Sequence, residues 1–322
     1  MIIAVIVIAI GAVLVITDLK NQESQQVTAG NSTYTGSGFR EVSWKGQNYK
    51  FNNQLITILL SGLDSEGKME EYTSYTTGPQ SDSIQLLVID PQTHEMHIVA
   101  LDRNTITKIR KYTVSGYDRG LFEDFLCFAF MYGNGGKASC ENLAEAVSLL
   151  MYNVPIRDYV VMNRSSLEAI AKIVGPVEVT VPNDDLAEAD PKYTKDSTVV
   201  VDATNIDQYV HYRNTDEHFS NEGRMQRQES YINAAMAQFM EKIENEPDAV
   251  WKDLEQMEDC MQTNITRNRY LELVKATKDI DYTSDNFIIP EGEAVVGTYY
   301  DEFYVDQEAL IEIILDLFYI AQ

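Results

Sequence analysis

The chain has 322 residues, and its 25 basic and 50 acidic residues give a formal net charge of -25 at pH 7. Hydrophobic residues make up 44% of the chain, enough to form a core, which excludes general disorder. So acidic a protein lacks the basic footprint that binding a phosphate backbone requires, which argues against a nucleic-acid partner.

An apolar segment opens the chain. From Ile2 to Ile16 the residues are apolar without interruption, and as a helix they span roughly 24 Å, slightly less than the ~30 Å hydrocarbon core of a bilayer. No Lys or Arg precedes the run and no small-x-small cleavage motif directly follows it. We therefore expect a membrane anchor over residues 1–17 whose cytoplasmic start precedes this sequence. A secretory signal peptide and a buried helix or strand are the alternatives.

A polar segment follows the anchor. Residues 21–47 are rich in Ser, Thr, Gly, Gln and Asn, which predicts a flexible tether over residues 18–49. The folded domain is then expected over residues 50–322, outside the membrane.

Three aliphatic and β-branched runs predict the first strands of this domain, at residues 55–60, 84–90 and 97–101. The first run ends near Gly62 and is typical of a strand that is buried on both faces. Residues 91–94 have the composition of a turn, so the second and third strands should pair as a hairpin.

Helical patterns dominate the rest of the chain. Helices are predicted at residues 121–132, 139–152, 166–174, 205–212, 223–243, 248–261, 266–277 and 307–320. Short strands are expected at residues 177–181, 287–289 and 295–299. This mixture predicts an α/β (α+β) fold, a three-layer α/β/α domain around a central mixed β-sheet.

The three cysteines are Cys127, Cys140 and Cys260. An odd number without short spacing predicts neither a zinc site nor a disulfide framework. We expect buried free thiols, and a Cys127–Cys140 pair in an oxidising compartment is the alternative.

Two carboxylates form the first part of a candidate site. Asp64 directly follows the first predicted strand and Asp82 begins the second, so the return of the chain between them should bring both side chains together. Such carboxylates repel each other unless a cation lies between them. Mg²⁺ is suited because it takes one or two carboxylates and completes its octahedron with waters and phosphate oxygens. The alternative is that each Asp caps a loop or turn.

Basic residues form the second part. Arg103 ends the third strand at the same sheet edge, and Arg213 follows a predicted helix. Arg224 and Arg227 lie three residues apart, hence on one face of the next predicted helix. They lie in its first turn, where the helix dipole disfavours cations, and this conflict points to a function. Gln228 adds a neutral donor. Chemistry on a pyrophosphate requires arginines that bind phosphate oxygens and, opposite them, carboxylates that hold a metal ion.

Together these residues resemble the LytR–CpsA–Psr domain of Gram-positive cell envelopes. The resemblance covers Asn53 to Gln228 and, more weakly, the rest of the chain. It is carried by motifs that are specific in their order and spacing, namely Gly62-Leu63-Asp64, Ser81-Asp82-Ser83, Asp102-Arg103-Asn104-Thr105, Ala129-Phe130-Met131-Tyr132-Gly133, Gly175-Pro176-Val177-Glu178-Val179, Tyr212-Arg213, Gly223-Arg224 and Arg227-Gln228.

The resemblance implies a phosphotransferase that attaches an anionic glycopolymer, a teichoic acid or capsular polysaccharide, from a polyisoprenyl-pyrophosphate carrier to peptidoglycan. It implies that Asp64 and Asp82 hold Mg²⁺ and that Asp82, which also assists proton removal, acts in catalysis with Arg103. The residues implied to bind the pyrophosphate-linked glycan are Arg103, Arg213, Arg224, Arg227 and Gln228. The lipid tail would occupy an apolar tunnel lined by residues 121–131 and 149–151. The family's architecture also implies a single-pass protein of the cell membrane with its domain extracytoplasmic.

Two departures from the family's pattern favour other functions. Gln80 and His211 stand where the family usually has arginines. Their loss favours a scaffold or regulator that binds polyprenyl-linked glycans with little or no catalysis. The retained carboxylates and arginines favour the transferase, or a hydrolase that cuts the lipid pyrophosphate with water as acceptor.

Overall fold

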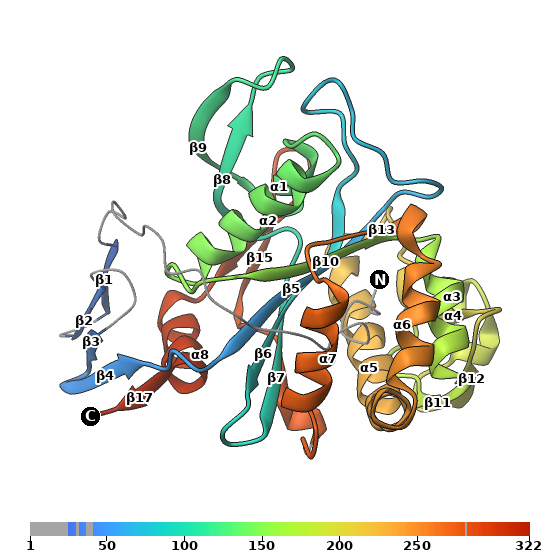
Figure 1. The fold of residues 1–322 in the computed structure, drawn as a ribbon. Coiled ribbons are helices and arrows are strands. Elements are labelled where there is room, and N and C mark those ends of the chain that lie inside the picture. The colour runs from blue at the N-terminus through green and yellow to red at the C-terminus, as the bar shows by residue number, and fades with distance from the viewer. Residues whose placement is uncertain (1–24, 30–31, 37–40, 281) are drawn as a thin grey trace.

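A six-stranded mixed sheet forms the centre of the protein in a computed structural model, which describes residues 25–29, 32–36, 41–280 and 282–322 (Figure 1). In spatial order its strands are β13 (Met261–Thr263), β10 (Asp158–Asn163), β5 (Ile56–Leu63), β6 (Ser81–Asp90), β7 (Glu95–Leu101) and β14 (Phe287–Ile288). β10 runs parallel to β5 and β14 runs parallel to β7, whereas the other neighbours are antiparallel. The predicted hairpin of the second and third strands is confirmed as β6–β7.

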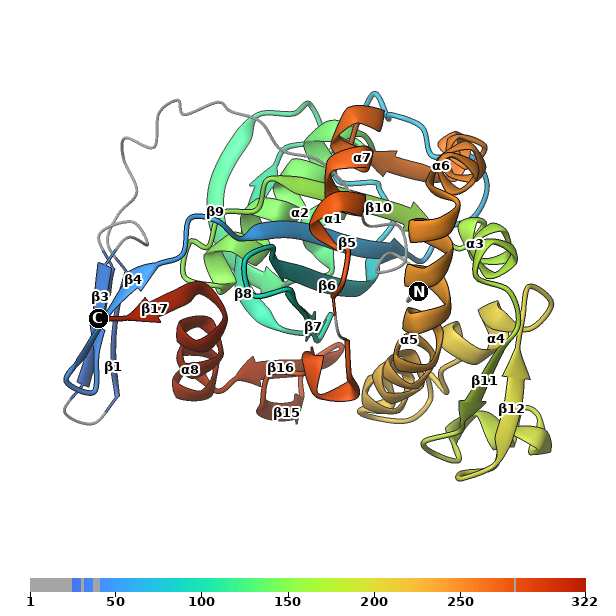
Figure 2. The same cartoon turned by 60° about the horizontal axis from the view of Figure 1, so that its bottom comes forward.

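Side chains that alternate along the strands divide the core into two layers. Ile58 and Leu60 of β5 pack into one hydrophobic cluster, and Leu59 and Leu63 pack into the other. The first cluster is covered by α3 (Ser166–Val174), α4 (Ile206–His211), α5 (Ser220–Asn245), α6 (Pro247–Glu255) and α7 (Arg267–Ala276). The second is covered by α1 (Phe128–Met131), α2 (Lys137–Leu150) and α8 (Gln307–Phe318). Figure 2 shows the α3–α6 group and α8 on different sides of the sheet. The predicted three-layer α/β/α fold is therefore confirmed.

The segment predicted as a flexible tether contains regular structure. β3 (Glu41–Trp44) and β4 (Gln47–Phe51) form a small sheet with the last strand, β17 (Tyr319–Ala321). β1 (Gln25–Ala29) and β2 (Ser32–Gly36) form a hairpin before it. Val42 and Trp44 are buried in the second core cluster, so they anchor this sheet to the domain. The prediction of a tether up to residue 49 is thus corrected. The polar composition of the segment masked the alternation of buried and exposed residues in β3 and the pairing of β4 with the distant strand β17.

A β-hairpin replaces most of the helix predicted at residues 121–132. β8 (Ile106–Tyr112) pairs with β9 (Asp118–Phe125), and only the short helix α1 follows. The chain turns at Gly116, whose positive φ of 82° favours glycine. A short aromatic run suits either element, and here pairing with a second strand decided the outcome.

The remaining elements mostly follow the predictions. β11 (Val177–Thr180) alternates buried and exposed residues as expected, and it pairs with β12 (Thr198–Val201). β15 (Gly292–Val296) and β16 (Asp301–Val305) form a further hairpin. The described residues also include four short 3₁₀ helices, η2 (Asp185–Glu188), η3 (Pro191–Tyr193), η4 (Glu258–Cys260) and η5 (Ser284–Asn286). The core strand β10 was not predicted, and the helix predicted to reach residue 261 ends at residue 255, where η4 and β13 follow.

The predicted anchor over residues 1–17 lies outside the described residues. Within the described ranges, no helix combines the length and apolar character that crossing a bilayer needs. Cys127, Cys140 and Cys260 are all free thiols, so the alternative of a Cys127–Cys140 disulfide is not adopted.

Candidate functional site

The ends of three neighbouring strands bring the first predicted site residues together. Asp64 follows β5, Asp82 lies at the start of β6 and Arg103 follows β7, all at one edge of the sheet. The register of β5 and β6 pairs Gly62 with Ser83 and Leu63 with Ser81, so Asp82 is the extra residue of a β-bulge. A bulge re-aims a side chain out of the regular alternation.

Asp82 is the centre of a buried polar cluster. The residue is only 5% exposed. Oδ1 accepts a hydrogen bond from Arg103 Nη1, while Oδ2 accepts from Arg224 Nη1 at 2.9 Å and lies 3.1 Å from His211 Nε2. Burial alone would favour the neutral acid, but Arg224, the His211 hydrogen bond and Arg103 together hold the pKa of Asp82 well below its usual range. Asp82 is therefore an ionised carboxylate that gathers two guanidinium groups and an imidazole.

Arg224 is fixed in the interior by α5. Its guanidinium also donates to the backbone oxygen of Asp82 at 3.2 Å and to Asn221 Oδ1 at 2.6 Å. Burial lowers the pKa of Arg224 to about 10, so it remains protonated at neutral pH. α5 begins at Ser220, three residues earlier than predicted, so Arg224 lies beyond the first turn and its position is not explained by the free amides at the helix start.

Gln80 connects Arg103 to Asp64. Its side-chain oxygen accepts a hydrogen bond from Arg103 Nη2. Its backbone N–H donates to Asp64 Oδ1 at 2.9 Å, and its carbonyl accepts from the Asp64 N–H at 3.1 Å. Burial, and next the charge of Asp82, raise the pKa of Asp64. Gln80 thus serves as an acceptor that orients Arg103.

These strand ends open into a cavity of about 530 Å³, here called the strand-end pocket. Its lining comprises Asp64, Gln80, Arg103, Asn104, Phe125, Cys127, Phe128, Arg213, Thr215, Asp216, Glu217, His218, Val296, Gly297, Thr298, Tyr299, Tyr300 and Asp301. Among the residues that the structure describes, the Arg213 guanidinium has no hydrogen-bond or ion-pair partner. Burial, and next the charge of Arg103, lower the pKa of Arg213. A half-buried guanidinium without an internal partner is available to an anionic ligand.

Arg227 and Gln228 are not brought to this pocket. Arg227 is fully buried, and its guanidinium donates to the backbone oxygens of Tyr209 (3.0 Å) and Tyr212 and to Asn183 Oδ1 at 3.0 Å. Gln228 donates to the Val210 carbonyl at 3.1 Å. Both side chains fix the end of α4, which carries His211 and leads to Arg213, so their contacts support the site from behind.

At Gly223, α5 lies very close to the loop that holds Arg227. Asn183 Nδ2 donates to the Gly223 carbonyl at 2.9 Å, and a Cβ at residue 223 would collide with the Asp185 carboxylate. We expect Gly223→Ala to displace the Asp185 carboxylate from Arg227. The free energy of unfolding should fall by no more than about 1 kcal/mol, because the higher helix propensity of Ala offsets part of the overpacking cost. Urea denaturation of this variant and of the control Gly78→Ala, whose Cβ would meet no atom closer than 3.4 Å, tests this. A fall of more than about 1 kcal/mol relative to Gly78→Ala would contradict the expectation.

A histidine–aspartate pair at the rim of the pocket was not predicted. His218 Nδ1 lies 2.7 Å from Asp301 Oδ1, and Asp301 Oδ2 accepts the backbone N–H of Phe219 at 2.7 Å. The His218 side chain is 64% exposed, whereas Asp301 is nearly buried. The two residues are 83 positions apart, and no local motif in the sequence links them.

Aromatic rings form one wall of the pocket. Phe125 packs against Phe128 at a centroid distance of 5.3 Å, and Tyr300 contacts both rings edge-on at 5.9 and 6.4 Å. Other residues of the predicted tunnel lie elsewhere. Leu121 and Phe122 are exposed on the β8–β9 hairpin, and the side chains of the second core cluster include Leu126, Phe130, Leu150 and Met151.

The two carboxylates fit a magnesium ion that shares its coordination with a ligand. In the described ranges, no group of three or more His, Cys, Asp or Glu side chains is arranged to hold a metal. Asp64 Oδ2 accepts no hydrogen bond from another described residue, and Asp82 Oδ1 accepts one, from Arg103, so each oxygen retains a lone pair. Burial, and after it the charge of Asp82, raise the pKa of Asp64, and a divalent cation beside both carboxylates would relieve the repulsion between them.

Comparisons with known proteins agree on one family. The model of the LytR_cpsA_psr family matches residues 16–314, whereas no curated protein sequence matches the chain. Among solved structures, protein gbs0355 from Streptococcus agalactiae is 22% identical, with a TM-score of 0.61 over 82% of this chain and 86% of its own. TagV from B. subtilis is 19% identical, with a TM-score of 0.57 over 83% and 96%. TagT from B. subtilis is 17% identical, with a TM-score of 0.58 over 82% and 90%. TagT also has structures bound to LIIa-WTA and to LI-WTA. At these identities the structural likeness shows the shared fold.

Proposed function

Because this chain belongs to the LytR_cpsA_psr family, we propose that it is a phosphotransferase that moves an anionic cell-wall glycopolymer from a polyisoprenyl-pyrophosphate carrier to peptidoglycan. The observation that carries the proposal is the strand-end pocket, which is lined by Asp64, Arg103 and the unpaired Arg213, with Asp82 buried behind it and paired with Arg103. TagT, which shares the fold, binds wall teichoic acid species, which supports a teichoic acid as the polymer. We also propose that residues 1–17 anchor the domain on the outer side of the cell membrane.

The positive side chains have distinct roles in this proposal. Arg213 and Arg103 line the pocket and bind the pyrophosphate oxygens directly. Arg224 is buried behind them and holds Asp82, so it contributes its charge through that contact. Asp64 and Asp82 would hold Mg²⁺, which supplies additional neutralisation of the phosphate charge. Phosphoryl transfer needs mainly positioning and charge neutralisation, so this set is chemically sufficient.

The proton of the acceptor hydroxyl needs a base. Asp82 is poorly suited, because its contacts with two arginines hold its pKa far below its usual range. His218 lines the same pocket, and Asp301 orients its ring through Nδ1 so that Nε2 is left for a ligand. We therefore assign proton removal to His218. The acceptor oxygen then attacks the polymer-side phosphorus, its proton goes to His218 Nε2, and the lipid phosphate leaves.

The proposal is tested by incubating the full-length protein with a polyprenyl-pyrophosphate-linked oligosaccharide, peptidoglycan fragments and Mg²⁺. Formation of a phosphodiester-linked product together with lipid phosphate release supports the transferase. Release of lipid phosphate without a linked product would show a hydrolase. Saturable binding without release would show the scaffold that Gln80 and His211 favour, and either result would overturn the transferase.

Arg213→Gln should weaken the activity without weakening the fold. The side chain has no internal partner among the described residues, so its loss leaves no buried group unsatisfied. One charge-assisted contact to a phosphate is worth about 1.5–3 kcal/mol, which corresponds to roughly a ten- to 150-fold fall in kcat/KM. The transfer assay and thermal unfolding measure the two effects. The matched control is Arg119→Gln on the exposed β8–β9 hairpin, and an equal effect of both variants on kcat/KM would remove Arg213 from the site.

A further inference from the structure

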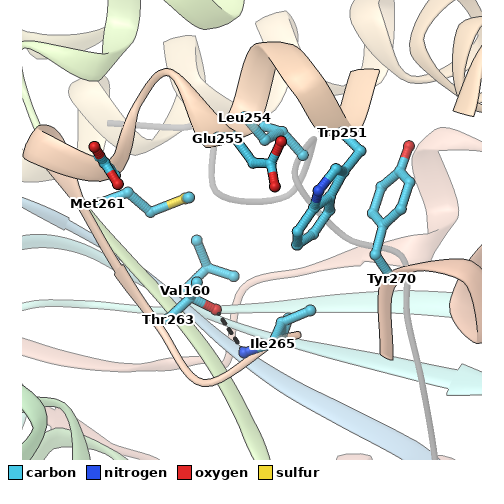
Figure 3. Close-up of a pocket in the computed structure, with 9 residues that line it drawn as sticks. Val160, Trp251, Leu254, Glu255, Met261, Thr263, Ile265 and Tyr270 are labelled. Carbon is cyan, nitrogen blue, oxygen red and sulfur yellow. Dashed lines mark hydrogen bonds between the residues drawn. The ribbon is translucent and has the colours of Figure 1, made fainter. Parts of the chain in front are cut away.

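A second cavity of about 460 Å³ lies at the β13 edge of the sheet (Figure 3). It is lined by Val160, Trp251, Leu254, Glu255, Glu258, Met261, Thr263, Ile265 and Tyr270. None of these residues lines the strand-end pocket. The volume lies in the range of sites for small organic ligands.

The walls of this cavity are apolar and aromatic. Figure 3 shows Val160 and Ile265 on its lower side and Trp251 and Glu255 on its upper side. The rings of Trp251 and Tyr270 lie 5.0 Å apart with an angle of 46° between their planes. Tyr270 is held in place because its hydroxyl donates to the Pro247 carbonyl at 2.7 Å.

Two carboxylates border the aromatic surface without a partner. Glu255 lies four residues after Trp251, on the same face of α6, and Glu258 follows in η4. In the described part of the chain, neither glutamate makes a hydrogen bond or an ion pair.

Three basic side chains near the cavity are paired with other acids. Lys68 lies 2.7 Å from Asp259, and the remaining pairs are Arg267 with Asp248 and Arg269 with Asp158. The charge of Glu258 also acts on Lys68, whereas Glu255 has no bonded partner among the described residues. The cavity therefore carries negative charge beside an apolar, aromatic wall.

We propose that this cavity binds a small organic cation, an ammonium group attached to an apolar or aromatic body. The faces of Trp and Tyr attract cations, and an adjacent carboxylate adds to that attraction. Anions, including phosphates, are repelled by the same carboxylates. A neutral apolar ligand fills the cavity but gains nothing from Glu255 and Glu258. This site does not depend on the proposed transferase activity.

The two tryptophans of the chain make the proposal directly measurable. Trp44→Phe leaves Trp251 as the single tryptophan, so its fluorescence reports on the cavity. Titration of this full-length variant with 2-phenylethylammonium chloride should give a saturable change and a 1:1 stoichiometry by calorimetry. The neutral 2-phenylethanol should bind at least about tenfold more weakly than the ammonium probe. The anion 3-phenylpropionate should not bind. Absence of saturation with the ammonium probe, or equal affinity for the neutral probe, would overturn the proposal.

A charge-matched pair of variants separates the cavity from the general acidity of the protein. Glu255→Gln with Glu258→Gln should weaken binding of 2-phenylethylammonium by about tenfold or more. Glu178→Gln with Glu241→Gln removes the same charge at distant exposed positions and should leave the affinity unchanged. Should the cavity pair fail to fold, Glu255→Gln alone provides the comparison. If both pairs weakened binding of 2-phenylethylammonium equally, the effect would come from net charge alone, and the proposed site would be refuted.

Discussion

Asp82→Asn should abolish glycopolymer transfer and strongly destabilise the fold. The variant removes the negative charge that Arg103 and Arg224 share, and Arg224 is only 2% exposed. Leaving buried guanidinium groups without their carboxylate costs about 3–5 kcal/mol. The free energy of unfolding from urea denaturation should fall by that amount. The transfer rate should drop below detection, because Arg103 and the implied metal ion both lose their shared ligand.

The control for Asp82 is another buried acid that pairs with an arginine outside the pocket. Asp158 is 7% exposed and accepts hydrogen bonds from Arg269. Asp158→Asn should also lower stability, yet the folded fraction should retain transfer. If folded Asp82→Asn, verified by circular dichroism, transferred glycan at the normal rate, Asp82 would be excluded from the site.

His218→Ala should reduce kcat by about 10²–10⁴-fold, the usual contribution of a general base. KM should change little, because Arg103 and Arg213 still bind the pyrophosphate. Stability should also change little, since the His218 side chain is largely exposed. Transfer assays over a range of substrate concentrations measure the two kinetic constants.

Imidazole added to His218→Ala should restore part of the lost rate, because the variant leaves room for a free base beside Asp301. His94→Ala, on the exposed turn between β6 and β7, is the matched control and should keep the full rate. A normal kcat for His218→Ala would refute the assignment. A reduced kcat that imidazole does not restore would point to a structural role.

The central strands and the first site residues could be predicted because their signals are local. Continuous aliphatic runs marked β5, β6 and β7, and Asp64, Asp82 and Arg103 lie directly at the ends of those runs. Antiparallel pairing of neighbouring strands then places the three side chains at one edge without further information.

Other features depended on contacts between distant segments. Arg224 and Arg227 have the same spacing signal, yet Arg224 binds Asp82 whereas Arg227 binds the backbone of α4. Only the packing of α5 against α4 decides between these roles. The pairing of β8 with β9 and the contact of His218 with Asp301 could not be predicted for the same reason. In each case the sequence around one partner does not identify the other.

The small sheet that joins β17 to β4 has a consequence for how the domain can be built. Tyr319 pairs with Phe51, and the Asn52 N–H donates to the Phe318 carbonyl at 2.8 Å, so the last helix ends beside the strand that leads into the central sheet. In topological terms the domain is nearly a closed ring. Within residues 41–322, a short linker could join β17 to β3 and the chain could be reopened at the β8–β9 tip, a circular permutation of this part that leaves every layer in place.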